Sequence, residues 1–140
     1  MENSKIAYDL CTLIDNKIIA YYRQTFKGVV GQSQLEVLNY LHIHKKATAK
    51  EIVSELNIPK QHISKILNKF QEDNLVQYIT DETDKRAKIY SLTEEGLKLM
   101  ELHISKSNEY FNEIINKLSK EEQMEFTATM KVFLEYLMKL

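Results

Sequence analysis

The polar side chains between Pro59 and Gln71 are of types that form hydrogen bonds with base pairs, and no acidic residue interrupts them. Amide side chains pair with adenine edges, lysine pairs with guanine, and serine bonds to bases or phosphates. A helix would place four of them on one face at i, i+3, i+4 and i+7, namely Gln61, Ser64, Lys65 and Asn68. Beside that face lie Lys60, His62 and Lys69. A merely solvated face usually mixes acids with bases, so the pattern favours contact with the major groove of DNA.

A second group of basic residues belongs to the polar segment from Asp81 to Arg86. The flanking segments, 75–80 and 87–92, are rich in β-branched and aromatic residues and predict the strands of a hairpin. An arginine at a hairpin tip can enter a minor groove, whose negative potential attracts it. Asp84 can hold the guanidinium of Arg86 in a fixed pose. Charged turns are common in hairpins, so this motif alone leaves DNA contact and plain solvation equally open. The remaining candidates for DNA contact are Thr48, Lys50, Pro59, Lys85 and Lys88.

Two short helices must hold the first of these groups in place. The earlier helix begins at a capping box formed by Thr48 and Glu51. It ends at Asn57, a residue that tolerates the left-handed conformation of a tight turn. The later helix begins with Pro59 at its first helical position and runs to about Asn74. Apolar residues at helical spacing give both helices one side that packs inward.

Longer helices are expected towards both ends of the chain. Apolar spacing predicts them at about 5–26 and 33–44. Thr93 caps a long helix that runs to about Leu118, and a capping box at Ser119 opens the last helix. The fold class is therefore mainly α with a small β-hairpin, in the order α-α-α-α-β-β-α-α. Two short helices followed directly by a hairpin form a winged helix-turn-helix.

The terminal helices carry more apolar surface than the small winged lobe between them can cover. We expect one unit over residues 1–140, a winged helix-turn-helix lobe at 33–92, and dimerisation helices at 1–28 and 97–140. Exposed apolar surface of that size usually marks an interface. The sequence therefore predicts a homodimer, whose two-fold symmetry would set two DNA-binding helices about 34–36 Å apart.

The order of residues after the helix pair resembles a family motif. Asp84, Arg86, Leu92, Thr93 and Gly96 match the D-x-R…L-T-x-x-G pattern of the MarR (multiple antibiotic resistance regulator) family. The resemblance covers nearly the whole chain in its helix order and wing position. It implies a homodimer on a pseudo-palindromic operator, with Arg86 in the minor groove and Asp84 supporting it. It also implies a transcriptional regulator, most often a repressor, that a small ligand or an oxidant releases from DNA.

Composition limits the alternatives. The chain has 140 residues, 44% hydrophobic and 28% charged, which is typical of a globular domain. Its net charge of −1 argues weakly against nucleic-acid binding, but a neutral total can hide a locally basic surface. A single cysteine excludes an internal disulfide and fits a reducing compartment. Neither a signal segment nor a membrane span is recognised, so we expect a cytoplasmic protein with no membrane partner.

The sequence gives weaker support for a redox, ligand, metal or catalytic site. Cys11 is a candidate redox sensor, although a buried and inert cysteine is favoured. The candidate pocket for a small aromatic ligand consists of Tyr21, Tyr22, Phe26 and Tyr40. His42 and His44 point to different sides of a helix, so neither a metal site nor any cofactor is predicted. No catalytic motif is found, which disfavours an enzyme. A winged helix that binds only proteins remains the alternative, and an acidic or apolar outward face after Pro59 would favour it.

Overall fold

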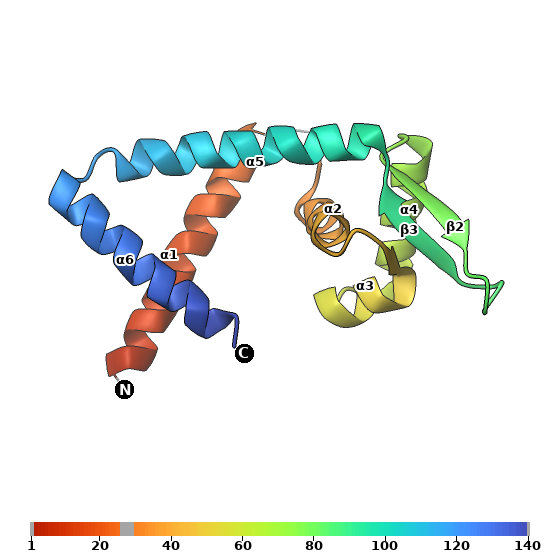
Figure 1. Ribbon diagram of the computed structural model, residues 1–140, viewed down its shortest axis with the longest axis horizontal. Coiled ribbons are helices and arrows are strands. Elements are labelled where there is room, and N and C mark those ends of the chain that lie inside the picture. Colours follow the sequence, from red (N-terminus) through yellow and green to blue (C-terminus); the bar gives the residue numbers. More distant parts are fainter. Residues whose placement is uncertain (1, 26–29, 140) are drawn as a thin grey trace. The chain divides into compact units, whose positions relative to one another are not determined.

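The computed structural model describes residues 2–25 and 30–139, and the chain divides into two compact units, Met1–Glu101 and Leu102–Leu140. The mainly helical fold with a small antiparallel sheet confirms the predicted fold class (Figure 1). No helix in the described part of the chain has the length and apolarity needed to cross a membrane. The elements are α1 (Glu2–Thr25), α2 (Gln32–His44), β1 (Ala47–Thr48), α3 (Ala49–Leu56), α4 (Lys60–Glu72), β2 (Val76–Thr80), β3 (Lys88–Leu92), α5 (Glu94–Ile115) and α6 (Lys120–Leu137).

The hydrophobic core lies where α2, α3 and α4 meet the sheet. The apolar side chains predicted to point inward on α4 are all buried, namely Ile63, Ile66, Leu67 and Phe70. From α3, Ile52 is fully buried, and Val53 and Leu56 pack against the core. Other core members are Val37, Leu38, Leu41, Ala47, Val76, Tyr90, Leu92 and Met100. Burying the apolar side of α4 leaves its polar side outermost.

Caps and turns define where the two short helices begin and end. The Thr48 hydroxyl accepts a hydrogen bond from the Glu51 amide at 3.2 Å, and the Glu51 carboxylate accepts one from the Thr48 amide at 2.7 Å, which confirms the capping box. Asn57 adopts the expected left-handed conformation, with φ 52° and ψ 36°. Pro59 was expected inside α4 but is its N-cap, with an extended ψ of 138°. Its carbonyl accepts from the amides of His62 and Ile63, so the helix begins one residue later than predicted.

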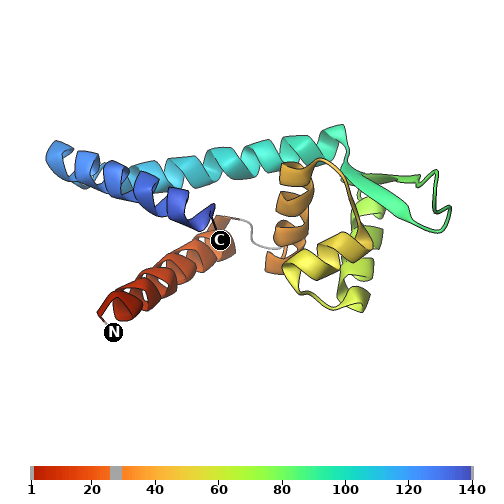
Figure 2. The ribbon, with the colours of Figure 1, turned by 60° about the horizontal axis from the view of Figure 1, so that its bottom comes forward.

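The predicted hairpin is confirmed, but the sheet has one strand more. The order is β1-β3-β2, with all neighbours antiparallel. The short strand β1 pairs Ala47 with Tyr90 and Thr48 with Ile89. Beyond this pairing, the tip of the hairpin projects away from α3 and α4 (Figure 2). We call β2, β3 and the loop between them the wing.

A small group of contacts fastens the base of the wing to the start of α5. The Thr93 hydroxyl donates to the carbonyl oxygen of Asn74 at 2.6 Å and accepts from the Gly96 amide at 3.1 Å. The Thr93 amide donates to the carbonyl oxygen of Leu75 at 3.0 Å. A side chain at position 96 would overlap that same carbonyl oxygen, so the close approach requires glycine. We call Asn74, Leu75, Thr93 and Gly96 the clasp.

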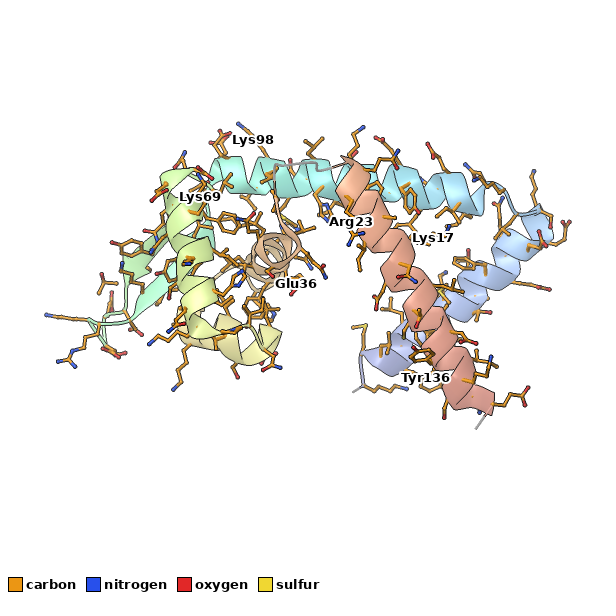
Figure 3. All side chains as sticks on the ribbon, turned by 180° about the vertical axis from the view of Figure 1, so that it is seen from behind. Lys17, Arg23, Glu36, Lys69, Lys98 and Tyr136 are labelled. Carbon is orange, nitrogen blue, oxygen red and sulfur yellow. The ribbon has the colours of Figure 1, made fainter. Side chains whose placement is uncertain are left out.

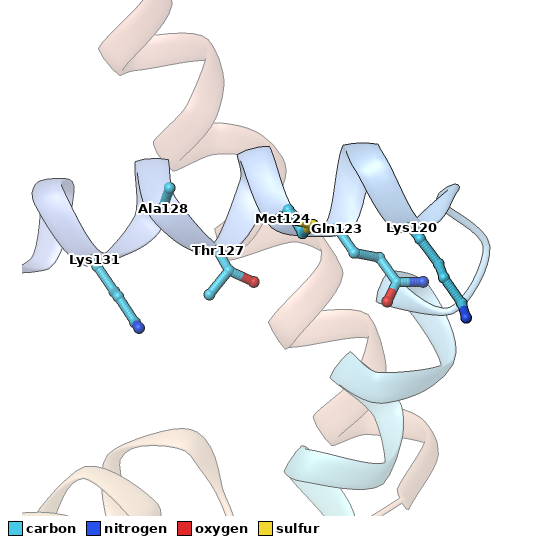
Figure 4. Close-up of a pocket in the computed structure, with 6 residues that line it drawn as sticks. All are labelled: Lys120, Gln123, Met124, Thr127, Ala128 and Lys131. Carbon is cyan, nitrogen blue, oxygen red and sulfur yellow. The ribbon is translucent and has the colours of Figure 1, made fainter.

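The helices outside the lobe expose many apolar side chains. The Ser119 capping box that opens α6 is present as predicted, with bonds of 3.2 and 2.7 Å to Glu122. None of the described residues of α6 is buried. A shallow hollow on α6 is lined by side chains of that helix alone (Figure 4), namely Lys120, Gln123, Met124, Thr127, Ala128 and Lys131. The exposed apolar residues of α1 are Ile6, Tyr8, Leu13 and Ile14, and those of α6 are Met124, Phe126, Val132, Leu134, Tyr136 and Leu137.

Candidate nucleic-acid interface

The outward side of α4 carries every polar residue that the sequence placed there. All seven are exposed, namely Lys60, Gln61, His62, Ser64, Lys65, Asn68 and Lys69. They lie opposite the four buried apolar residues because a helix repeats every 3.6 residues. We call these seven residues the α4 face. Its donors and acceptors are free of the protein core and can meet another molecule.

One lysine of the α4 face already has an acidic partner. Lys69 Nζ lies 2.9 Å from Asp73 Oδ1, one helical turn further on (Figure 3). The hydrogen bond and the charge of Asp73 raise the pKa of Lys69 above its ordinary value. Lys60 and Lys65 take part in no ion pair within the described residues. The positive charge of the α4 face is therefore most available in its first half.

The loop of the wing is held by its own acidic residues. Asp81 Oδ1 accepts from the amide of Thr83 at 3.0 Å and from its hydroxyl at 2.9 Å. These hydrogen bonds lower the pKa of Asp81 below its ordinary value, because they stabilise the carboxylate. The Asp81 amide donates to the Ala87 carbonyl, and the Ala87 amide donates to the Asp84 carbonyl, both at 2.9 Å. The loop thus has a defined shape before any ligand arrives.

The contact predicted between Asp84 and the guanidinium of Arg86 is not present. Asp84 Oδ1 instead accepts from the main-chain amide of Arg86 at 3.0 Å. In the part of the chain that the structure describes, no ion pair joins the two side chains. A carboxylate two residues before an amide forms a local turn readily, and this bond needs no ordering of the long arginine side chain. Asp84 therefore fixes the backbone under Arg86, while the Arg86 side chain and that of Lys85 remain exposed.

Lys88 has an aromatic partner that the sequence reasoning did not identify. Its ammonium lies 4.2 Å from the centroid of the Tyr78 ring. Tyr78 in turn lies 5.8 Å from the Tyr90 ring, centroid to centroid, and Tyr90 is only 7% exposed. The clue in the sequence was the hairpin itself, since residues diagonal across two strands share a face. Finding it required the register, which places Tyr78 opposite Tyr90 and Thr80 opposite Lys88.

The remaining candidate residues lie outside these two surfaces. Thr48 is half-buried and caps α3, and Lys50 is exposed on the same helix. Cys11 is exposed on α1, so the burial favoured from the sequence does not occur within the chain.

The candidate ligand pocket is only partly described. Phe26 and the side chain of Tyr22 lie outside the described residues. Tyr21 is half-buried, and Tyr40 stacks on His44 with ring centroids 4.1 Å apart. Burial, followed by the charges of Glu55 and Glu51, raises the pKa of Tyr40. Among the described residues, no three acidic, histidine or cysteine side chains come together as a metal site.

The helices α2 to α4 and the three-stranded sheet define a winged helix-turn-helix. Residues 28–87 match the model of the MarR family. The chain is 24% identical over 108 residues to YvnA of Bacillus subtilis (strain 168), an uncharacterised helix-turn-helix transcriptional regulator, covering 75% of this chain and 69% of that one. The family model over residues 28–87 and the motif at Asp84 to Gly96 point to the same family, the MarR family.

Solved structures agree with this fold. A mutant of MepR from S. aureus superposes with a TM-score of 0.78 at 23% identity, covering 94% of this chain and 97% of that chain. A second MepR mutant, bound to an oligodeoxyribonucleotide, superposes with a TM-score of 0.67 at 24% identity, covering 96% of this chain and 97% of that chain.

Proposed function

We propose that this regulator binds a specific DNA operator as a homodimer, with the α4 face in the major groove and Arg86 of the wing in the minor groove. The observation that carries the proposal is the α4 face, where seven exposed polar residues include three lysines and no acid. Such a surface suits both phosphates and base edges. The MepR mutant bound to an oligodeoxyribonucleotide gives a precedent for this fold on DNA.

The proposed homodimer is supported by the exposed apolar side chains of α1 and α6. On α6 the exposed fraction reaches 74% for Met124 and 63% for Tyr136. Leaving many such groups in water is unfavourable by roughly 25 cal/mol for each Å² of apolar surface. A second copy of the chain can cover them. Two-fold symmetry would then present two α4 faces to a pseudo-palindromic site.

We further propose that the regulator is a repressor and that a signal releases it from DNA. A signal of this kind must bind better to a form of the dimer that does not fit the operator. MepR of S. aureus bound to ethidium bromide is a precedent for an aromatic ligand on this fold. Tyr21, Tyr22, Phe26 and Tyr40 are the candidate pocket, and Cys11 is the candidate site of an oxidant.

Selection from a pool of random DNA duplexes, followed by sequencing, tests the proposal. The expected result is a pseudo-palindromic consensus that binds two copies of the chain. Arg86→Ala should weaken binding to that consensus and reduce the slope of log Kd against log salt by about 1, since one cation contact is lost. Lys98→Ala is the matched control, because Lys98 is exposed but lies near Glu94 and Glu95 on α5 (Figure 3). Equal salt slopes for both variants would contradict the role of the wing.

A further inference from the structure

We infer that Tyr78 is a positioning residue, which holds the ammonium of Lys88 ready for a phosphate of the DNA backbone. The inference rests on the proposed DNA binding and adds a residue to it. Tyr78 does not belong to the α4 face or to the loop of the wing. It acts through Lys88.

The geometry of the wing places three side chains in a row from the core to the solvent. Tyr78 and Tyr90 are directly opposite in the strand pair β2–β3, and so are Thr80 and Lys88. Lys88 is therefore the diagonal neighbour of Tyr78 on the same face of the sheet. Tyr90 is buried among the core residues, and the rings of Tyr78 and Tyr90 meet at an interplanar angle of 54°. The core thus fixes Tyr90, Tyr90 supports Tyr78, and Tyr78 supports Lys88.

The ring of Tyr78 is the contact that gives the exposed Lys88 a preferred position. None of the ion pairs among the described residues involves Lys88. At 4.2 Å from the centroid, its ammonium is within the range in which an aromatic face attracts a cation. At an exposed site that attraction corresponds to about a two- to fivefold preference for the held position.

A lysine side chain that is already ordered in the free protein binds a phosphate with higher affinity. A free lysine side chain loses much rotamer freedom when it is fixed against a partner. Where the free protein already restricts that side chain, less is lost on association and the affinity is higher. The ring face leaves the three N–H donors of the ammonium able to reach a phosphate oxygen. Tyr78 should therefore raise DNA affinity without itself contacting DNA.

A double-mutant cycle tests this, measured by fluorescence anisotropy on a mixed-sequence duplex of about 30 base pairs, because phosphate contacts do not depend on sequence. Tyr78→Leu should raise Kd about two- to fivefold, as the held position is lost. Tyr78→Phe keeps the ring and should bind like the native protein. In the Lys88→Ala background, Tyr78→Leu should have no further effect. A purely structural role for Tyr78 would weaken binding equally in both backgrounds and would overturn the inference. So would a loss of affinity in Tyr78→Phe, which would assign the contact to the hydroxyl.

A measurement on the free protein separates this inference from the proposed function. The ring current of Tyr78 should shift the side-chain methylene protons of Lys88 upfield in NMR spectra, and Tyr78→Leu should abolish the shift. Absence of the upfield shift in the native protein would overturn the positioning role, even if DNA binding is strong. If the native protein failed to bind any duplex at low salt, the proposed function would fail, and this inference with it.

Discussion

Replacing Gly96 by alanine should disrupt the clasp and destabilise the protein, although the change adds only one methyl group. The new Cβ would overlap the carbonyl oxygen of Leu75 and would lie 3.1 Å from its carbonyl carbon and 3.4 Å from Cβ of Leu92. The obstacle is main chain, so no side-chain rotation relieves it. The start of α5 must move outward or the Leu75 carbonyl must turn away, and either movement strains the site and disrupts the hydrogen bond that this carbonyl accepts from the Thr93 amide at 3.0 Å.

The cost can be estimated from these two consequences. Overpacking a well-filled site costs about 1–3 kcal/mol. Losing the hydrogen bond between Thr93 and Leu75 adds about 1 kcal/mol. Alanine recovers about 0.5 kcal/mol, because it has less conformational freedom than glycine in the unfolded chain. Gly96→Ala should therefore lower the free energy of unfolding by about 1.5–3.5 kcal/mol. With an m-value of about 2 kcal/mol/M, the urea midpoint should fall by about 0.8–1.8 M.

Urea unfolding followed by circular dichroism measures this change, at one fixed protein concentration because the stability of the proposed homodimer would depend on concentration. Gly31→Ala is the matched control. A Cβ at Gly31 would approach only the end of the Gln34 side chain, at 3.7 Å, and its φ of −75° suits any residue. Gly31 is the N-cap of α2, where alanine is less favourable than glycine, so that variant should lose only about 0.5–1 kcal/mol, less than Gly96→Ala. Equal midpoints for Gly96→Ala and Gly31→Ala would refute the reasoning.

Two further predictions concern backbone strain and a buried histidine. Lys45 has φ 69° and ψ −40°, a conformation that residues with a side chain rarely adopt, so Lys45→Gly should raise the free energy of unfolding by about 0.5–1 kcal/mol. Lys46→Gly should lower it in the same urea experiment, since Lys46 has no positive φ to relieve. Burial lowers the pKa of His103 below its ordinary value of 6.5, so the unfolded chain binds the proton more readily. The contribution of His103 to stability is therefore complete above about pH 6.5 and is lost as the pH falls below it. His103→Gln should reduce this pH dependence in unfolding curves at about pH 5.5 and 7.5, whereas His62→Gln, at an exposed site, should preserve it.

Local rules in the sequence were enough to locate the helices. Both capping boxes, at Thr48 and Ser119, formed as predicted because each uses groups within four residues of one another. The buried side of α4 followed from its spacing of apolar residues, and its exposed side followed from the same period. The candidate site is predictable to the same extent. The exposure of the polar residues on this helix follows from the burial of their apolar neighbours, so it can be predicted without knowing the rest of the fold.

What the sequence did not predict depends on contacts between distant segments. The strand β1 has only two residues, too few for an alternating pattern, and its existence depends on Tyr90 and Ile89 more than forty positions away. The clasp likewise joins Asn74 to Thr93 across nineteen positions. The partner of Lys88 depended on the strand register. These features arise from how elements dock, and local pattern carries little information about docking.

The motif from Asp84 to Gly96 combines two different physical tasks. Thr93 and Gly96 belong to the clasp, so their half of the motif builds the fold. Asp84 belongs to the loop, where it holds the backbone beneath Arg86. A protein could keep Thr93 and Gly96 and still lose DNA binding. It could equally lose Asp84 and Arg86 and still fold. Presence of the whole motif is therefore stronger support for a DNA-binding role than the fold alone.

The net charge of −1 is a weak argument against DNA binding when the positions of the acidic residues in the structure are taken into account. Asp81 and Asp84 accept hydrogen bonds from main-chain amides of the wing loop, and these bonds hold the loop in its shape. Asp73 affects one lysine at the end of the α4 face and leaves Lys60 and Lys65 without an acidic partner among the described residues. Exposed charges act over only about 10 Å at 0.1 M salt. A phosphate at the α4 face would therefore respond mainly to the lysines beside it, and the total over 140 residues has little bearing on that encounter.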